Sequence, residues 1–330
     1  MRRYRNLIIL TLSVFLLTGT VIAKESLRQL TKEGEEKFEI LDKDLIEKII
    51  QFPLDTKPIE DFYAKKRGKT DFSLGRLTFS PTGDKIAFSV NNDSIWIVKS
   101  NGAGLHCLTC DLENTHSPYW SKDGNLITFI ETSDKESDVT SGIYMTMKPD
   151  GSKKTVIGSF NIRRPNNKLF PPWYYSTNGQ YLLRPSTKPM EHNVYIQRVK
   201  DGKLIATYET RASILDMAWF PNSLEALLEE FKGHGESKLA VFSLTGKKET
   251  ILPIGRMNME SAIHPSGHLI AYFNEYENTL NFLTKDGKKK IPVIKMLKTS
   301  INEMIWTQRG DTLAFSSKNQ IYLVTLKRIP

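Results

Sequence analysis

Six stretches of the chain share one pattern of apolar and polar positions. In each stretch a large apolar residue stands four positions before a turn residue, and two positions that lie two residues apart follow the turn, apolar in all but one case. Residues two apart lie on the same face of a strand, so the pattern predicts a hairpin packed on a core. The turn residues recur at intervals of 41, 55, 44, 44 and 43 residues: Gly83, Gly124, Gly179, Ser223, Gly267 and Gly310. Arg184 is the one departure from the apolar positions after the turn.

Each stretch begins and continues in the same way. A third apolar segment follows the hairpin, and then comes a tight-turn pair such as Asn101-Gly102 or Asp150-Gly151 before a fourth short segment. Asn-Gly and Asp-Gly pairs accept positive φ and favour tight hairpins. Four antiparallel strands that recur every 41–55 residues are typical of a propeller blade. The sequence therefore predicts an all-β domain over residues 74–330, a six-bladed β-propeller of four-stranded antiparallel blades. The large apolar residues that stand four positions before the turns are Phe79, Trp120, Tyr175, Trp219, Ile263 and Trp306.

The N-terminal extension, residues 24–73, is expected to close the ring. The sixth unit stops at Pro330, where its fourth strand should begin. A strand from the N-terminal region could complete that blade and remove a free sheet edge. Residues 27–31 and residues 49–54 are both candidates, and the sequence does not choose between them.

Residues 35–51 have a different pattern from the blades. Their apolar residues recur at roughly helical spacing with Glu and Lys between them, which predicts a short amphipathic helix. That helix could pack on the side or rim of the propeller, or it could dock a partner; the first is the more common use of such a stripe. Residues 55–71 are polar and are interpreted as a linker.

The first 23 residues are typical of a secretory signal peptide. Arg2, Arg3 and Arg5 precede an apolar run over residues 7–17, and cleavage is expected after Ala23. An uncleaved membrane anchor is the alternative, although the apolar run is barely long enough to span a bilayer. Removal of this segment takes away three arginines, so the net charge falls from +9 to +6. We therefore expect a periplasmic or secreted protein that meets the membrane only during export, or through the anchor if it is kept.

Composition and charge exclude several other classes of protein. With 39% hydrophobic and 25% charged residues the chain can form a core, and two cysteines exclude a disulfide-rich scaffold. The basic excess is spread along the chain. The one strong basic run, residues 288–290, adjoins a predicted turn, and exported proteins rarely meet nucleic acid. No nucleic-acid partner is expected.

The repeat resembles that of a known family. The segments FSPTGDKIAFS, YWSKDGNLITFI and IYMTMKPDG are similar to the TolB-like, WD-type repeat (PD-repeat) of β-propellers in exported bacterial proteins. TolB works in the periplasm as a protein-binding part of an envelope complex. The resemblance therefore implies a scaffold that binds a protein or a cell-envelope component. It implies no binding residue, because its motifs build hairpins.

Connection lengths predict which face binds the partner. The first-to-second and third-to-fourth connections of each blade are short, whereas the long ones, such as residues 131–142 and 159–172, all fall on the opposite face. Loops carry function more often than the scaffold that positions them. We expect this long-loop face, with the mouth of the central channel, to bind the partner. Its most ligand-like cluster combines cations with an aromatic ring: Arg163, Arg164, Lys168 and Phe170.

The two cysteines stand three residues apart on the fourth strand of the first unit. In an oxidising compartment, Cys107 and Cys110 are expected to form a local disulfide, with free thiols as the alternative. The bond requires the strand to end near Thr109, because residues three apart on a strand point to opposite faces. The second half of a zinc-binding pattern is missing.

Catalytic constellations are scarce in the sequence. There is no G-x-S-x-G elbow, P-loop or dinucleotide fingerprint, so no catalytic, cofactor-binding or metal-binding residue is assigned. His116, His192 and His234 fall near the long-loop face in different units. A metal-dependent, lyase-like, carbohydrate-active enzyme that uses channel histidines is therefore the alternative function. We favour a non-catalytic, monomeric binding protein, and the question of an enzyme stays open at this point.

Overall fold

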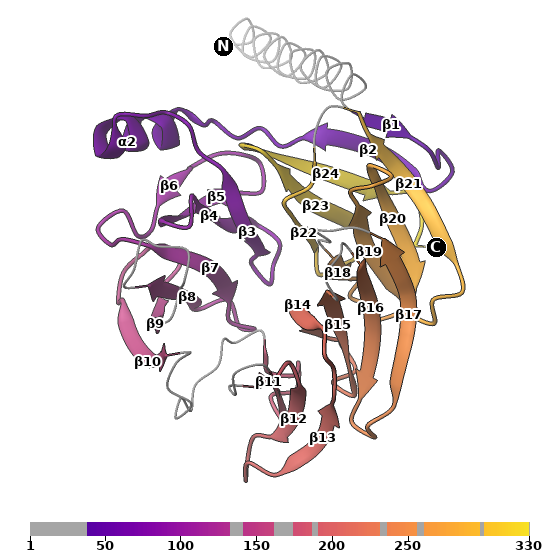
Figure 1. The fold of residues 1–330 in the computed structure, drawn as a ribbon. Coiled ribbons are helices and arrows are strands. Elements are labelled where there is room, and N and C mark those ends of the chain that lie inside the picture. Colours follow the sequence, from indigo (N-terminus) through magenta and orange to yellow (C-terminus); the bar gives the residue numbers. More distant parts are fainter. Residues whose placement is uncertain are drawn as a thin grey trace, which may run out of the picture.

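Six antiparallel sheets surround a common axis in the computed structural model of the protein (Figure 1). The structure describes residues 38–132, 141–161, 174–186, 191–231, 236–255, 261–297 and 300–329. The expected signal peptide and the candidate closing segment at residues 27–31 lie outside these ranges. Within them, no helix is long and apolar enough to cross a bilayer.

The first three sheets follow the chain from its N-terminal side. Blade 1 consists of β3 (Leu74–Phe79), β4 (Lys85–Val90), β5 (Ser94–Lys99) and β6 (His106–Cys107). Blade 2 consists of β7 (Thr115–Trp120), β8 (Ile127–Thr132), β9 (Ser141–Met147) and β10 (Thr155–Asn161). Blade 3 consists of β11 (Tyr181–Pro185), β12 (Val194–Arg198) and β13 (Leu204–Tyr208). At its innermost position, the described part of blade 3 has a single β-bridge between Tyr175 and Leu182.

The remaining three sheets complete the ring. Blade 4 consists of β14 (Ser213–Trp219), β15 (Glu225–Phe231), β16 (Glu236–Ser243) and β17 (Lys248–Gly255). Blade 5 consists of β18 (Ser261–Ile263), β19 (Leu269–Asn274), β20 (Thr279–Thr284) and β21 (Lys290–Met296). Blade 6 contains β22 (Glu303–Trp306), β23 (Thr312–Ser317) and β24 (Gln320–Leu326). The prediction of a six-bladed propeller is confirmed.

An N-terminal strand closes the ring, as predicted. β2 (Ile46–Gln51) pairs antiparallel with β24 and becomes the fourth strand of blade 6, so the closing segment overlaps the candidate at residues 49–54. A further strand, β1 (Phe38–Ile40), pairs with β21 and gives blade 5 a fifth strand. The N-terminal extension therefore covers two neighbouring sheet edges.

The predicted helix over residues 35–51 is wrong. Most of its apolar residues lie in β1 and β2, and in β2 Ile46 and Ile49 are both buried although they stand three residues apart. A β-bulge between Ile46 and Lys48 inserts an extra residue, which brings the two isoleucines to the same face and imitates helical spacing.

The helix lies instead where a linker was expected. α2 (Lys57–Arg67) starts with a proline in its first turn and ends at Gly68, whose φ is 65° and whose N–H donates to the carbonyl of Ala64. Proline at the start and glycine after the end are ordinary helix boundaries. Ile59 and Tyr63 are buried against blade 1.

Apolar clusters fill the spaces between neighbouring blades. One cluster joins blades 5 and 6 and includes Phe38, Ile46 and Ile49 of the closing strands. Another joins blades 6 and 1 and includes the buried residues of α2. Further clusters join blades 1 and 2, blades 3 and 4, and blades 4 and 5. The N-terminal closure is thus part of the hydrophobic core.

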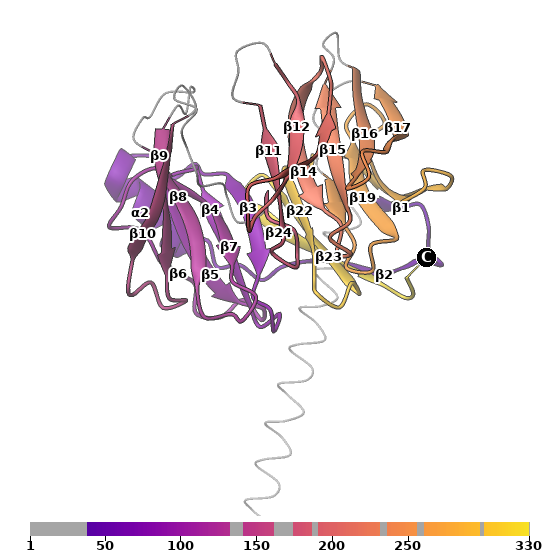
Figure 2. The ribbon, with the colours of Figure 1, turned by 90° about the horizontal axis from the view of Figure 1, so that it is seen from below.

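The two ends of the barrel-shaped ring differ. Each inner strand starts at the end of the ring that carries the long connections, and it ends at a tight turn such as residues 80–84 or 121–126. We call the end formed by the first-to-second and third-to-fourth connections the tight-turn face, and the other end the long-loop face. In Figure 2 the tight turns lie along the lower edge of the blades. The structure describes every connection of the tight-turn face from residue 41 to residue 329.

Candidate binding site at the central channel

Charged residues occupy one repeat position on three inner strands. Arg76 of β3, Asp216 of β14 and Glu303 of β22 each stand three residues before the aromatic residue that ends the strand. Because inner strands run from the long-loop face to the tight-turn face, this position lies toward the long-loop end of the channel. The inner strands surround the axis in Figure 1.

Bulges shape the inner strands near this position. The register shifts between Leu74 and Leu77 in β3 and between Ile214 and Asp216 in β14. β7 has a corresponding shift between His116 and Tyr119. A bulge leaves a residue outside the regular ladder and turns its side chain away from the regular alternation. These three bulges surround the same stretch of the channel.

The side chains converge from five blades. Burial and the positive charge of Arg76 in blade 1 both lower the pKa of His116 in blade 2. Burial raises the pKa values of Tyr119 in blade 2, of Tyr174 at the entry to blade 3 and of Glu303 in blade 6, and the charge of Arg76 opposes each increase. Asp216 of blade 4 adds to the increase at Tyr174 and Glu303. The charges of Arg76 and Asp216 thus act on groups of several blades, as expected for residues of inner strands.

We call five of these residues the channel cluster: Arg76, His116, Tyr174, Asp216 and Glu303. Burial is the largest cause of the pKa shifts of His116, Tyr174 and Glu303. Burial, together with the charge of Arg76, lowers the pKa of His116 to about 4, so the imidazole is neutral at physiological pH. Burial raises the pKa of Tyr174 to about 12. It also raises the pKa of Glu303, against the influence of Arg76.

Apolar side chains are exposed beside the channel cluster. Tyr119 of β7 is 41% exposed, and Leu215, in the bulge of β14, is 50% exposed. Large apolar groups that remain accessible next to half-buried charges are typical of a recognition surface. The cluster therefore offers a cation, carboxylates and apolar contacts to a ligand that enters from the long-loop face.

The residues predicted from sequence are distributed differently. Arg163, Arg164, Lys168 and Phe170 lie outside the described residues, within the link between β10 and Tyr174. His116 belongs to the channel cluster, His192 lies before β12, and His234 is outside the described ranges. In the described part of the chain no three His, Cys, Asp or Glu side chains form a group that could hold a metal ion. The sequence did not single out Arg76, Asp216 or Glu303, although an alignment of the six units at this position would have.

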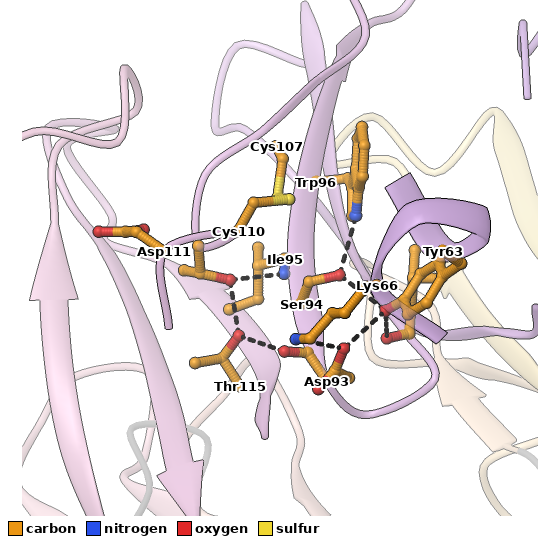
Figure 3. Close-up of a disulfide and its surroundings, with 12 residues drawn as sticks. Tyr63, Lys66, Asp93, Ser94, Ile95, Trp96, Cys107, Cys110, Asp111 and Thr115 are labelled. Atoms are coloured by element: carbon orange, nitrogen blue, oxygen red, sulfur yellow. Dashed lines mark hydrogen bonds and ion pairs between the residues drawn. A yellow bond between two sulfur atoms is a disulfide. The ribbon is translucent and has the colours of Figure 1, made fainter. Parts of the chain in front are cut away.

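Cys107 and Cys110 are joined by a disulfide at the outer edge of blade 1 (Figure 3). β6 ends at Cys107, and buried Thr109 lies between the two cysteines. Thr109 Oγ1 accepts the N–H of Ile95 at 2.8 Å and bonds Thr115 Oγ1 at 2.6 Å. The disulfide thus encloses a residue that links blade 1 to blade 2.

A buried carboxylate continues this network to the helix. The Asp93 side chain, 2% exposed, accepts hydrogen bonds from Lys66 at 3.0 Å and Tyr63 at 3.2 Å (Figure 3). It also pairs with Arg67 at 3.1 Å. Burial opposes ionisation of Asp93, but the hydrogen bond from Lys66 and the charges of Lys66 and Arg67 hold its pKa below the ordinary value. Asp93 is therefore a structural anion that fixes α2 on blade 1.

Comparison with known proteins finds similarity in structure only. No protein-family model matches the chain, and no curated protein matches it in sequence. The crystal structure of TolB from Acinetobacter baumannii matches with a TM-score of 0.51 at 13% identity, over 69% of this chain and 55% of TolB. The Cps50 (Swd1) β-propeller domain of Myceliophteria thermophila matches with a TM-score of 0.56 at 12% identity, over 77% of this chain and 96% of that domain.

These similarities establish the fold. The protein is a six-bladed propeller of the architecture shared by TolB-like and WD-type propellers, which confirms the resemblance inferred from the repeat. The match spans about half the length of the TolB chain. The fold does not define a function, which must be argued from the site.

Proposed function

We propose that the protein is an exported, non-catalytic propeller that binds a protein or cell-envelope component at the long-loop end of its channel. The observation that carries the proposal is the channel cluster, in which side chains from five blades converge around Arg76. A partner segment that enters there can pair with Arg76 and the carboxylates while it covers Tyr119 and Leu215. Charge-assisted hydrogen bonds in such a sheltered place supply orientation as well as affinity.

The link between blades 2 and 3 adds support for this choice of face. Its described ends are Asn161, at the end of the outer strand β10, and Tyr174 of the channel cluster. The link therefore connects the outer edge of blade 2 with the channel. We propose that Arg163, Arg164, Lys168 and Phe170, which it contains, contribute to the same binding surface.

Site-directed photocrosslinking tests the proposal. p-Benzoylphenylalanine in place of Tyr119 puts the reactive group in the channel, and the same residue in place of Val199 puts it on the tight-turn face. Both side chains are more than two-fifths exposed. We expect irradiation of producing cells to give a discrete protein adduct from position 119 that is absent from position 199 and disappears with Arg76→Ala.

Two results would contradict the proposed function. Adducts of equal intensity at both positions, or an adduct at 119 that survives Arg76→Ala and deletion of residues 162–171, exclude the channel mouth as the binding site. Stoichiometric Mn or Zn in the purified protein, lost with His116→Ala, would support the lyase-like alternative over a non-catalytic role.

A further inference from the structure

The tight-turn face carries most of the basic excess of the folded protein. Its connections contain fourteen Lys and Arg against eight Asp. The connections between strands on the long-loop face contain fifteen basic and fifteen acidic residues in the sequence. The fourteen cations are Lys43, Lys122, Lys148, Lys153, Lys154, Lys200, Lys203, Lys247, Lys285, Lys288, Lys289, Arg309, Lys327 and Arg328.

Several of the acids on this face are engaged in the turns themselves. Asp150 Oδ1 accepts the N–H of Ser152 at 2.9 Å, and Asp286 Oδ1 accepts the N–H of Lys288 at 3.1 Å. Asp201 pairs with Arg198 at 2.7 Å, and this hydrogen bond lowers its pKa to about 2. These carboxylates remain charged, but they are directed to groups of their own blades.

Many of the lysines, by contrast, extend into solvent. The side chains of Lys247 and Lys288 are 73% and 84% exposed, and their ion pairs with Glu249 and Asp286 are open to water. Such exposed pairs contribute little and do not hold the ammonium groups back from another partner. Lys153, Lys200, Lys203 and Lys289 are also exposed. The turns that carry these lysines are short and lie along the lower edge of the ring in Figure 2, so the charges belong to one end of the molecule.

A hollow lies between blades 4 and 5 at this end of the molecule. A cavity of about 560 Å³ opens there, lined by Lys285, Lys288, Lys289, His268 and Thr284 together with acidic side chains. Lys285 forms an ion pair with Glu225 at its side and lies over the Phe220 ring at 4.9 Å. Lys289 is exposed at the cavity. The cavity has the size of a small-ligand site.

We propose that the tight-turn face docks on an anionic phospholipid surface. Each Lys or Arg near such a surface contributes attraction that acts over about one Debye length, so a broad layer of short basic turns suits a flat anionic partner. Docking in this orientation leaves the channel cluster directed away from the bilayer and free for its own partner. The inference concerns a different face from the proposed function and does not depend on it.

Vesicle flotation with the full chain tests the proposal. The probes are vesicles of phosphatidylcholine alone and vesicles of phosphatidylcholine mixed with phosphatidylglycerol. We expect binding to the mixed vesicles at about 0.01 M salt, where the Debye length is about 30 Å, and its loss at about 1 M, where that length is about 3 Å. The variant Lys200→Gln/Lys203→Gln/Lys289→Gln should weaken binding at least about 10-fold, given the contribution of each charge near the surface.

The matched control removes three exposed lysines from the long-loop face. Lys65→Gln/Lys69→Gln/Lys318→Gln changes the net charge equally. At about 0.1 M salt, where the Debye length is about 10 Å, it should leave vesicle binding within about 2-fold of the wild type, because charges beyond a Debye length are screened. Equal loss in the two variants would mean that only net charge matters, and would overturn the proposal.

The choice of lipids separates the face from the N-terminal apolar segment. Binding that is equal on neutral and anionic vesicles and insensitive to salt comes from hydrophobic insertion, and would overturn docking through the tight-turn face. A soluble anionic glycan that binds as tightly as the mixed vesicles, with the same loss in the first variant, would also overturn it, because the face would then be a general polyanion site. None of these outcomes changes the result expected from photocrosslinking at position 119, which tests the proposed function separately.

Discussion

Two histidines in the propeller have opposite roles because their surroundings differ. His264 is buried between blades 5 and 6, where its Nε2 donates to the carbonyl of Gly310 at 3.0 Å and its Nδ1 accepts the N–H of Ser266 at 3.0 Å. A side chain at position 310 would place Cβ 2.2 Å from Nε2, so glycine is needed there. Both ring nitrogens of His264 are therefore used in hydrogen bonds, and the one to Gly310 holds blades 5 and 6 together. His116, in contrast, lies in the channel and bonds only its neighbour Ser117 among the hydrogen bonds of the described residues.

The pKa of His116 reports the geometry of the channel cluster. Burial lowers it most, to about 4, and the charge of Arg76 adds to this effect. Removal of that charge with Arg76→Gln should raise the pKa toward the ordinary value of about 6.5 while burial keeps it lower. A proton NMR titration of the imidazole measures the shift.

The stability of the protein should follow the same titration. A neutral buried imidazole binds fewer protons than in the unfolded chain, so its contribution to stability falls as the pH drops from about 6.5 toward about 4. Arg211→Gln, at an exposed position in the connection between blades 3 and 4, is the control and should leave the pKa of His116 unchanged. An unaltered pKa in Arg76→Gln would show that Arg76 and His116 do not share the channel.

Helix α2 depends on a single buried carboxylate. The Asp93 carboxylate accepts a hydrogen bond from Tyr63 and forms ion pairs with Lys66 and Arg67, all three of which belong to α2. Asp61, which is itself part of α2, pairs only with exposed Lys57 among the described ion pairs. Asp93→Asn should lower the free energy of unfolding by about 1–3 kcal/mol, because buried donors lose a charged acceptor. It should also increase amide hydrogen exchange in residues 57–67. Asp61→Asn, the control, should change stability by less than about 0.5 kcal/mol.

Acid should release the helix in the same way. The folded-state pKa of Asp93 is lowered, so its contribution is present above the ordinary Asp value of about 4 and disappears as the pH falls through the lowered one. If the amides of residues 57–67 exchange hydrogen at the same rate in Asp93→Asn and in Asp61→Asn, Asp93 does not fix the helix.

At the level of elements, the sequence predicted the blades and the closure by an N-terminal strand, but not the positions of the helix and strands within the N-terminal extension. Hairpins with an apolar first residue and a Gly turn recur locally, so the repeat alone defines them. The spacing of Ile46 and Ile49 predicts a helix because a bulge in β2 brings two residues that are three positions apart to the same face of the strand. The bulge depends on pairing with β24, which the local sequence does not reveal. The channel cluster was missed for a related reason. Bulges in β3, β7 and β14 and the closure of the ring bring together residues that are far apart in sequence.

At the scale of the molecule, closure by β2 should decide whether the ring unfolds as a unit. Ile49 of β2 is 7% exposed in the core shared by blades 5 and 6, while Lys48 beside it is exposed. Ile49→Asp removes a buried side chain and places a charge in an apolar site, which should cost about 3–5 kcal/mol. Lys48→Gln changes the charge of the same strand by the same amount and should cost less than about 1 kcal/mol.

Tryptophan fluorescence distinguishes a global effect from a local one. Trp96, Trp120, Trp219 and Trp306 lie in blades 1, 2, 4 and 6, and all four are buried. The experiment introduces Ile49→Asp into variants that each keep one of these tryptophans and follows their unfolding in denaturant. If closure holds the whole ring, the midpoint should fall by the same amount at each tryptophan, because neighbouring blades share their cores. A shift confined to Trp306, with Trp120 and Trp219 unchanged, would mean that β2 stabilises only blade 6 and that the other blades fold without the closed ring.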